Sequence, residues 1–197
     1  MALLLARHGQ TTANAAGLLV GRIDPELTDL GRRQAVALGS AAGVPGATRV
    51  VCSPLGRCRA TAAALGLGVP VEIDERWIEI DYGPLDGTAL KDVPSAVWRS
   101  WRADPGWRPP GGESLVDVGL RVRAALSDLV EEAAADDIVV VSHVSPLKAA
   151  LAWALGTGDE VAWRIHLATA CLNRIVVTPA GPSVHSVNET THLAGLD

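Results

Sequence analysis

Two histidines in this sequence follow short apolar runs and could serve phosphate chemistry. The run "LLLAR" leads to His8, directly after Arg7, and "DIVVVS" leads to His143. Between them "CSPLGRCR" places Arg57 in the first turn of a predicted helix, where free backbone N–H groups favour an anion. Arginine neutralises phosphate oxygens, and neutral imidazole is a good nucleophile near pH 7. Together these residue types indicate an anion pocket that could bind phosphate.

These side chains can meet only if neighbouring elements bring them to one edge of a sheet. Apolar runs bounded by turn residues predict five strands, and segments with helical spacing lie between them. The alternation predicts an α/β layered fold with right-handed crossovers, in which ligands bind beyond the carboxyl ends of strands. The predicted strands are residues 3–7, 48–52, 70–73, 137–142 and 172–178.

Three segments are predicted to be helices from their spacing and their capping residues. Residues 27–42 have Thr28 as a cap, residues 53–65 have Ser53 followed by Pro54, and residues 114–134 have Ser114. Residues 88–112 are rich in Pro, Trp and Arg, and they indicate an excursion out of the core. The apolar side of the last helix is predicted to contain Leu115, Val118, Val122, Leu126 and Leu129.

Length and composition limit the class of protein. The chain has 197 residues, enough for a single domain over 1–197. It has no apolar run near the length of a membrane span and no signal-peptide pattern, so we expect no membrane partner and a cytoplasmic location. A net charge of -5 argues against a nucleic-acid partner. Cys52, Cys58 and Cys171 lack metal-like spacing and are expected to be reduced core residues.

Other chemistries fit these motifs less well. A zinc hydrolase needs a third ligand, and the arginines beside the histidines would repel a cation. Cys52 lies at the wrong spacing from Arg57 and Arg59 for a cysteine phosphatase loop. No G-x-x-x-x-G-K or G-x-S-x-G motif is present. Each motif alone would suit a surface charge or a core histidine, so the residues by themselves support an anion site without identifying a reaction.

Six segments in order resemble the histidine phosphatase superfamily, the phosphoglycerate-mutase-like proteins. They are "RHGQTTAN", "GRIDPELTDLGRRQA", "SPLGRCRATA", "WIEIDYGPLDG", "PPGGES" and "VVVSHVSPLKA". The resemblance extends from Leu5 to about Ala150. It implies a three-layer sandwich with a central, mostly parallel mixed sheet flanked by helices. It also implies a two-step mechanism through a phosphohistidine, with no metal and no cofactor.

The resemblance assigns expected roles to particular residues. His8 would be the nucleophile, and Arg7, Arg57 and His143 would hold the phosphoryl oxygens. The leaving alkoxide needs a proton; the residues alone leave Glu79, Asp81 and Asp86 open as the donor, and the resemblance selects Glu79. The expected substrate or phosphate contacts are Asn14, Gly21, Tyr82 and Val144.

Within the family, the sequence favours a hydrolase of a small phosphomonoester over a phosphoglycerate mutase. The segment that supplies extra basic residues in mutases is short and tryptophan-rich here, and Leu90 stands where a mutase usually has lysine. A non-catalytic binding module is a more remote alternative, because the expected catalytic set is complete. The excursion is expected to roof the pocket, and Trp98 or Trp101 to contact an apolar leaving group, with packing alone as the alternative. These expectations leave room for a homodimer.

Overall fold

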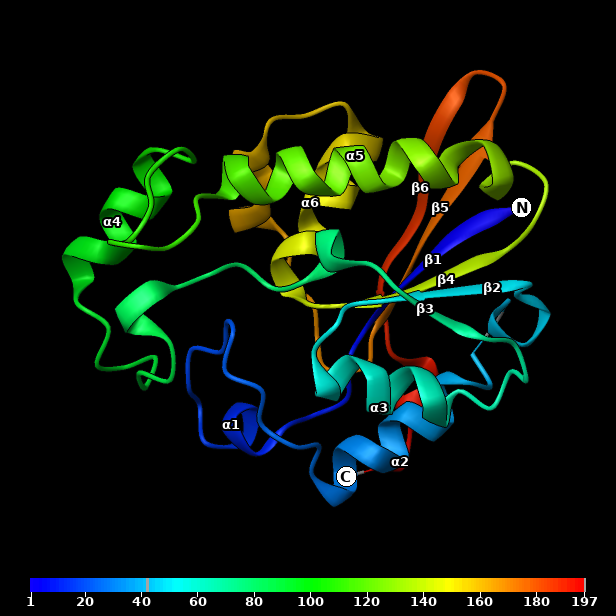
Figure 1. Cartoon of the computed structure of the whole chain (residues 1–197), viewed down its shortest axis with the longest axis horizontal. Coiled ribbons are helices and arrows are strands. Elements are labelled where there is room, and N and C mark those ends of the chain that lie inside the picture. The colour runs from blue at the N-terminus through cyan, green and yellow to red at the C-terminus, as the bar shows by residue number, and fades with distance from the viewer. Residues whose placement is uncertain (42, 197) are drawn as a thin grey trace.

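A six-stranded mixed sheet forms the centre of the structure, a computed structural model that describes residues 1–41 and 43–196 (Figure 1). The strands are β1 (Ala2–Arg7), β2 (Arg49–Cys52), β3 (Val71–Ile73), β4 (Ile138–Ser142), β5 (Leu172–Thr178) and β6 (Gly181–Glu189). Their order is β3-β2-β4-β1-β5-β6. The first three neighbouring pairs in this order are parallel and the last two are antiparallel, so the predicted mostly parallel sheet is confirmed.

Helices cover both faces of the sheet and complete the predicted three layers. Their bounds are α1 (Thr12–Ala15), α2 (Asp29–Leu38), α3 (Gly56–Ala64), α4 (Ser95–Ala103), α5 (Leu115–Ala133) and α6 (Val144–Leu155). In Figure 1, α5 and α6 lie on one side of the strands and α2 and α3 on the other. Helix α4 stands apart from these layers, within the predicted excursion.

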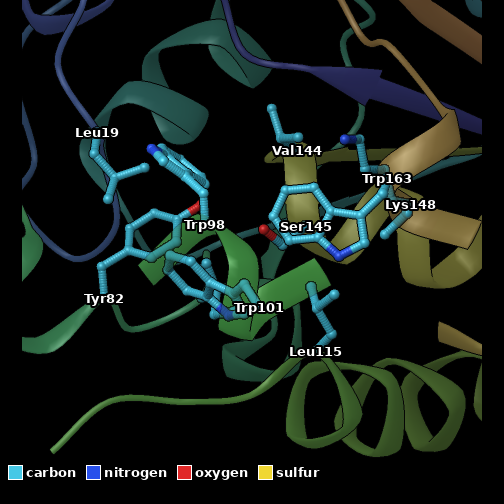
Figure 2. Close-up of a pocket in the computed structure, with 11 residues that line it drawn as sticks. Leu19, Tyr82, Trp98, Trp101, Leu115, Val144, Ser145, Lys148 and Trp163 are labelled. Atoms are coloured by element: carbon cyan, nitrogen blue, oxygen red, sulfur yellow. The ribbon is translucent and has the colours of Figure 1, made fainter. Parts of the chain in front are cut away.

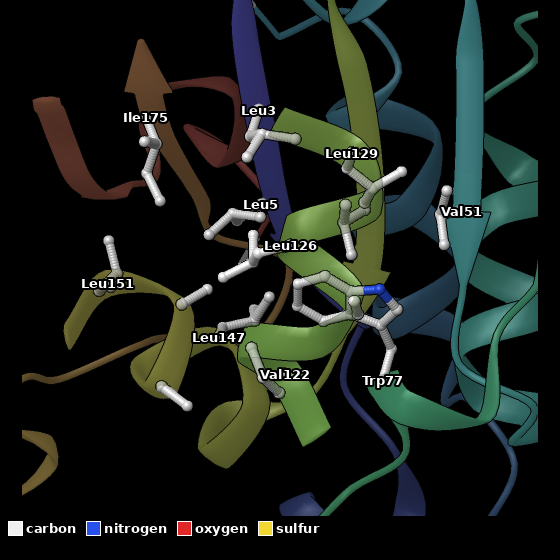
Figure 3. Packing of buried hydrophobic residues seen from close by; sticks show 14 of the residues in the cluster. Leu3, Leu5, Val51, Trp77, Val122, Leu126, Leu129, Leu147, Leu151 and Ile175 are labelled. Carbon is white, nitrogen blue, oxygen red and sulfur yellow. The ribbon is translucent and has the colours of Figure 1, made fainter. Parts of the chain in front are cut away.

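The larger core lies between the sheet and the α5/α6 layer (Figure 3). Alternate residues of β1, Leu3 and Leu5, face this layer, whereas Leu4 packs into the smaller core under α2 and α3. This alternation follows from the opposite directions of successive side chains on a strand. The predicted apolar side of α5 is confirmed: Val118, Val122, Leu126 and Leu129 are buried in the core, and Leu115 is half-buried against it.

Besides α1, α4 and α6, which were not among the three predicted helices, a helix cap and a strand differ from the sequence prediction. Ser53 does not cap α3: this helix begins at Gly56, after Leu55, and the Ser53 hydroxyl lies 2.7 Å from His143 Nε2. The N–H groups of Gly56 and Arg57 donate instead to the Asp24 carboxylate, at 2.5 and 3.2 Å. Strand β6 was not predicted, because its half-exposed sequence lacks a continuous apolar run.

The predicted caps Thr28 and Ser114 are confirmed, since their side chains accept hydrogen bonds from Gly31 N and Asp117 N, respectively. Ala42, the last residue of the first predicted helix, lies outside the described residues. Within residues 1–41 and 43–196, no helix combines the length and apolar character needed to cross a membrane.

Candidate active site

Strand register brings the two histidines together. Arg7 of β1 pairs with Ser142 of the parallel strand β4, so His8 and His143 each follow the same rung of the sheet. Their imidazole rings lie 5.2 Å apart between centroids, edge to face. Ser53 follows β2, the other neighbour of β4, at the same edge. The expected convergence at the carboxyl ends of these strands is therefore present in the structure.

His8 is buried and presents a defined tautomer. Its Nδ1 lies 2.8 Å from the carbonyl oxygen of Gly9, which can only accept a hydrogen bond. Nδ1 therefore carries the hydrogen and Nε2 keeps a lone pair. Burial lowers the pKa of His8 well below its ordinary value, and the charges of Arg7 and Arg57 lower it further. The imidazole is neutral near pH 7, as a nucleophile requires.

The charges of Arg7, which directly precedes His8, and of Arg57, from α3, both act on this imidazole. Arg7 Nη1 donates to the carbonyl of Leu167 at 2.6 Å, and Arg57 Nη2 donates to the carbonyl of Gly21 at 2.8 Å. The Nε atoms of both arginines are buried and have no acceptor among the described residues. Two guanidinium donors are thus available next to His8.

The loop that holds Arg57 is itself organised by a carboxylate. Both oxygens of Asp86 accept backbone hydrogen bonds from the consecutive residues Gly21, Arg22 and Ile23, at 2.7 to 2.8 Å. The carbonyls of Gly21 and Ile23 then accept from the Arg57 guanidinium. Gly21 therefore contacts Arg57 and does not line the cavity at His8. A side chain on Gly21 would collide with the Ile80 carbonyl, at 2.7 Å.

His143 lies behind His8, against β2 and α3. Its Nε2 is 2.7 Å from Ser53 Oγ and 3.3 Å from Cys58 Sγ. Burial lowers the pKa of His143 well below the ordinary value, and Arg57, His8 and Arg7 act in the same direction. Neither His143 nor Arg57 is among the residues that line the cavity at His8, so only His8 and Arg7 of the four predicted phosphate-site residues line it.

The three carboxylates that the sequence left open have different surroundings. Glu79 is buried and lines the cavity at His8; its Oε1 accepts from Ile80 N at 2.9 Å and from Ser145 N at 3.1 Å. Its Oε2 has no partner among the described residues. Asp86 is engaged by the loop at 21–23, and Asp81 Oδ1 accepts from Gly83 N at 2.7 Å. Neither aspartate lines the cavity.

The cavity at His8 has a volume of about 510 Å³. It brings together Arg7, His8 and Glu79 with three of the predicted substrate contacts, Asn14, Tyr82 and Val144. Asn14 is also fixed by its helix end, because its Oδ1 accepts from Thr11 N at 3.1 Å. Burial raises the pKa of Tyr82, so its hydroxyl stays protonated.

Lys148 and Trp163 are among the residues at the site that sequence reasoning missed. Lys148 lines the cavity at His8 and a second, smaller pocket beside it, and Trp163 lines the second pocket (Figure 2). Lys148 is the single charge in the apolar segment "VSPLKAALAWAL" that follows His143. A lone charge in an apolar helix that starts at the site is the signal that could have identified it.

Residues 1–41 and 43–196 contain no group of three or more His, Cys, Asp or Glu side chains arranged to hold a metal ion. The arrangement supplies instead a neutral imidazole, two cations with spare donors and a carboxyl group. These are the components of phosphoryl transfer without a metal.

Comparison with known proteins identifies the family. The model of the histidine phosphatase superfamily (branch 1) matches residues 3–190. The chain belongs to this superfamily. The predicted family and fold are thereby confirmed.

The chain is similar to the following three members of the histidine phosphatase superfamily. A bifunctional protein of Mycobacterium tuberculosis is 37% identical over 201 residues, which cover 97% of this chain and 54% of that protein. The chain thus spans about half the length of this relative. A glucosyl-3-phosphoglycerate phosphatase of M. tuberculosis is 38% identical over 166 residues, covering 76% of this chain and 74% of that protein. The solved structure of a mycobacterial glucosyl-3-phosphoglycerate phosphatase with VO3 has a TM-score of 0.85 and 30% identity, covering 96% and 99% of the two chains.

We expect the free energy of unfolding of this protein to fall as the pH is lowered. In the unfolded chain each histidine takes up a proton near its ordinary pKa of about 6.5, whereas the folded state keeps the pKa values of His8 and His143 well below that. The stability that the two neutral histidines contribute is fully present above the pKa that they have in the unfolded chain, and it is lost as the pH falls below that value. The expected slope is about 1.4 kcal/mol per pH unit for each histidine.

Chemical denaturation at several pH values between about 7.5 and 5 measures this slope. His8→Asn should remove one histidine's share of it, and His185→Asn, at an exposed position on β6, is the matched control. A slope that is equal in wild type and His8→Asn would contradict the expectation.

Proposed function

We propose that this chain is a phosphatase that hydrolyses a small-molecule phosphomonoester through a phosphohistidine on His8, without a metal or cofactor. One observation carries the proposal. The Nε2 lone pair of a neutral, buried imidazole shares a strand-end site with guanidinium N–H groups of Arg7 and Arg57 that have no acceptor among the described residues. A buried donor without a partner is costly, and a phosphoryl group supplies oxygen acceptors at that place.

In the first step, His8 Nε2 attacks phosphorus and the bond to the ester oxygen breaks. Charge develops on the equatorial phosphoryl oxygens in the transition state, and fixed cations stabilise it there. Arg7 and Arg57 supply this charge. His143, whose ring packs edge to face against that of His8, supplies a further N–H donor in this proposal.

Glu79 then provides the proton for the departing alkoxide. Its Oε1 is held by the N–H groups of Ile80 and Ser145, which leaves Oε2 as the oxygen that carries the proton. In the second step water attacks the phosphohistidine and the Glu79 carboxylate accepts a proton from it, which restores the enzyme and releases phosphate. Asn14, Tyr82 and Val144 line the space for the substrate, and Gly21 acts through Arg57.

Release of inorganic phosphate from a panel of metabolite phosphates, in the presence of a strong chelator, tests this function. We expect activity to be retained after exhaustive chelation, because the proposed steps use only side chains. Loss of activity on chelation, with recovery on adding zinc, would overturn the metal-free mechanism. No phosphate release from any ester would overturn the function itself.

A mutase assay separates the hydrolase from its main alternative. We expect very slow interconversion of 2- and 3-phosphoglycerate, even after the enzyme has been primed with the bisphosphorylated glycerate. Release of inorganic phosphate should be the main reaction instead. The reason is the cavity lining, in which Leu90 occupies the wall where mutases have a basic residue. Rapid interconversion with little phosphate release would reverse the assignment.

The proposal places the enzyme in the cytoplasm. Cys52, Cys58 and Cys171 are buried free thiols, as expected of a reducing compartment. Burial raises the pKa of Cys52 to about 12 and that of Cys171 to about 11, so both stay protonated and unreactive. Size-exclusion chromatography with light scattering would test the homodimer.

A further inference from the structure

A small pocket beside the cavity at His8 is walled by aromatic rings. Tyr82, Trp98, Trp101 and Trp163 surround it, and Val144, Ser145 and Lys148 enter from α6 (Figure 2). Ring centroids of Tyr82 and Trp101 are 5.3 Å apart, and those of Trp98 and Trp163 are 6.3 Å apart. Aromatic pairs at these distances stabilise one another, so the rings form a packed wall.

The size of the pocket limits what can enter. Its volume is about 90 Å³, against about 510 Å³ for the cavity at His8. An apolar cavity of about 150 Å³ accommodates benzene in another protein, so this pocket cannot enclose a ring by itself. Because it shares lining residues with the cavity at His8, a single ring or a short branched chain that lies partly in that cavity is the largest group that it suits.

The pocket opens toward the reaction centre. Leu19, Tyr82, Val144 and Lys148 line both it and the cavity at His8. A phosphate ester with phosphorus at His8 would therefore extend its leaving group across these shared residues into the aromatic walls. The pocket is thus placed to take part of the substrate and not a separate ligand.

Lys148 is the one charged residue among the described residues that line the aromatic pocket. It is half-buried, and no hydrogen bond or ion pair joins its ammonium to another described residue. Burial lowers its pKa, while the charge of Glu79 raises it. A partly desolvated cation at the junction of the two spaces calls for a negative group on the ligand.

We propose that the aromatic pocket binds an apolar, ring-sized leaving group that carries a carboxylate, with the ring among Trp98, Trp101 and Trp163 and the carboxylate on Lys148. The substrate class is thus the phosphate ester of an apolar hydroxy acid. This inference rests on the proposed phosphatase function.

A sugar of similar size is the competing occupant. Tryptophan faces can also stack on sugar rings, but each buried hydroxyl then needs a hydrogen-bond partner. Among the side chains that line the pocket, the hydroxyls of Ser145 and Tyr82 are the only groups that can accept a hydrogen bond, whereas the buried indole N–H groups of Trp101 and Trp163 have no partner among the described residues and can only donate. Few acceptors are thus available for sugar hydroxyls, so the walls favour an apolar ring that carries an acceptor such as a carboxylate.

Specificity constants for a matched set of esters test the proposal in the wild-type enzyme. The set is glycerol 3-phosphate, glucose 6-phosphate, benzyl phosphate, and the 3- and 4-carboxybenzyl phosphates. Benzyl phosphate is expected to exceed the glycerol and glucose esters by about tenfold, from burial of the ring. The better carboxybenzyl isomer is expected to exceed benzyl phosphate by about tenfold again, from its pairing with a half-buried ammonium.

Two substitutions locate these preferences. Ala162→Leu adds bulk to a buried wall of the aromatic pocket that does not line the cavity at His8, so the ratio of benzyl to glycerol ester should fall toward one. Ala168→Leu is the matched control, since it narrows the cavity at His8 instead and should lower all esters together. Lys148→Met should bring the ratio of carboxybenzyl to benzyl ester to about one, because it removes only the charge.

Titration with 4-(hydroxymethyl)benzoate, followed by tryptophan fluorescence, provides a readout that needs no turnover. Binding to the wild type that is weaker in Ala162→Leu and in Lys148→Met supports the proposal. Equal specificity constants for all esters, or ratios that Ala162→Leu leaves unchanged, overturn it while the phosphatase function stands. If no ester is hydrolysed, p-nitrophenyl phosphate included, the proposed phosphatase function fails. The titration then tests by itself whether the aromatic pocket binds the ring and its carboxylate.

Discussion

Replacing His8 by alanine is expected to lower kcat by about 10⁴-fold or more, since removing a nucleophile disables both chemical steps. The phosphorylated intermediate should disappear with it. After incubation with a labelled phosphate donor and a rapid quench, the wild type should carry an acid-labile label on His8, and His8→Ala should carry none.

His166 offers a matched control for this experiment. It lines the same cavity, yet it lies in an exposed position and follows no arginine. His166→Ala should keep the acid-labile label. A label that persists in His8→Ala, or that moves to an acid-stable form in the wild type, would show that another group attacks phosphorus.

Replacing Glu79 by glutamine should reveal the proton donor through its dependence on the leaving group. An alkoxide must be protonated as it departs, whereas a nitrophenolate leaves unaided, so the loss for an alkyl phosphate should be about 10²- to 10⁴-fold. The loss for p-nitrophenyl phosphate should be much smaller when transfer to His8 limits the rate. A burst experiment establishes which step is limiting, because Glu79 also serves the hydrolytic step. Glutamine retains an oxygen that can accept from Ile80 N and Ser145 N, so the local structure is preserved.

The neighbouring aspartates are the controls for Glu79→Gln. Asp86→Asn weakens the carboxylate that holds the backbone of residues 21–23, and through it Arg57, so every leaving group should be affected alike. Asp81→Asn alters a turn at Gly83 and should likewise show no dependence on the leaving group. A selective loss in either aspartate variant, with Glu79→Gln equal to wild type, would assign the acid elsewhere and leave the phosphohistidine intact.

The sequence predicted the elements whose signals are local. The five strands that it predicted are short runs rich in aliphatic and β-branched residues, bounded by turn residues, and the caps Thr28 and Ser114 bond within their own first turns. The convergence of His8 and His143 was also predictable, because parallel strands end at one edge of a sheet.

Features that depend on distant partners were not predictable from the sequence. The Ser53 hydroxyl is hydrogen-bonded to His143, 90 residues away in the sequence. The Asp24 carboxylate, from another loop, caps α3 in its place. The residues alone left Glu79, Asp81 and Asp86 open, because the distant backbone N–H groups that bind Asp86 and Glu79 follow no spacing rule, and only the family resemblance selected Glu79. Trp163 joins Trp98 at the pocket only because residues 159–164 fold back against α4.

The Asp86 carboxylate lies where residues 17–23 and residues 86–90 are joined by several hydrogen bonds. These bonds limit where the chain can take insertions that alter substrate specificity. Leu19 N donates to the Thr88 carbonyl, Gly87 N to the Leu19 carbonyl and Leu90 N to the Gly17 carbonyl, each at 2.8 to 2.9 Å. An insertion before Leu90 would pull on the loop that anchors Arg57. An insertion between Leu90 and Gly112 would reshape the roof and leave the anchor undisturbed. The segment before Leu90 must therefore keep its length, whereas the segment from Leu90 to Gly112 can vary. Loop libraries designed to alter specificity should be placed in the second of these segments.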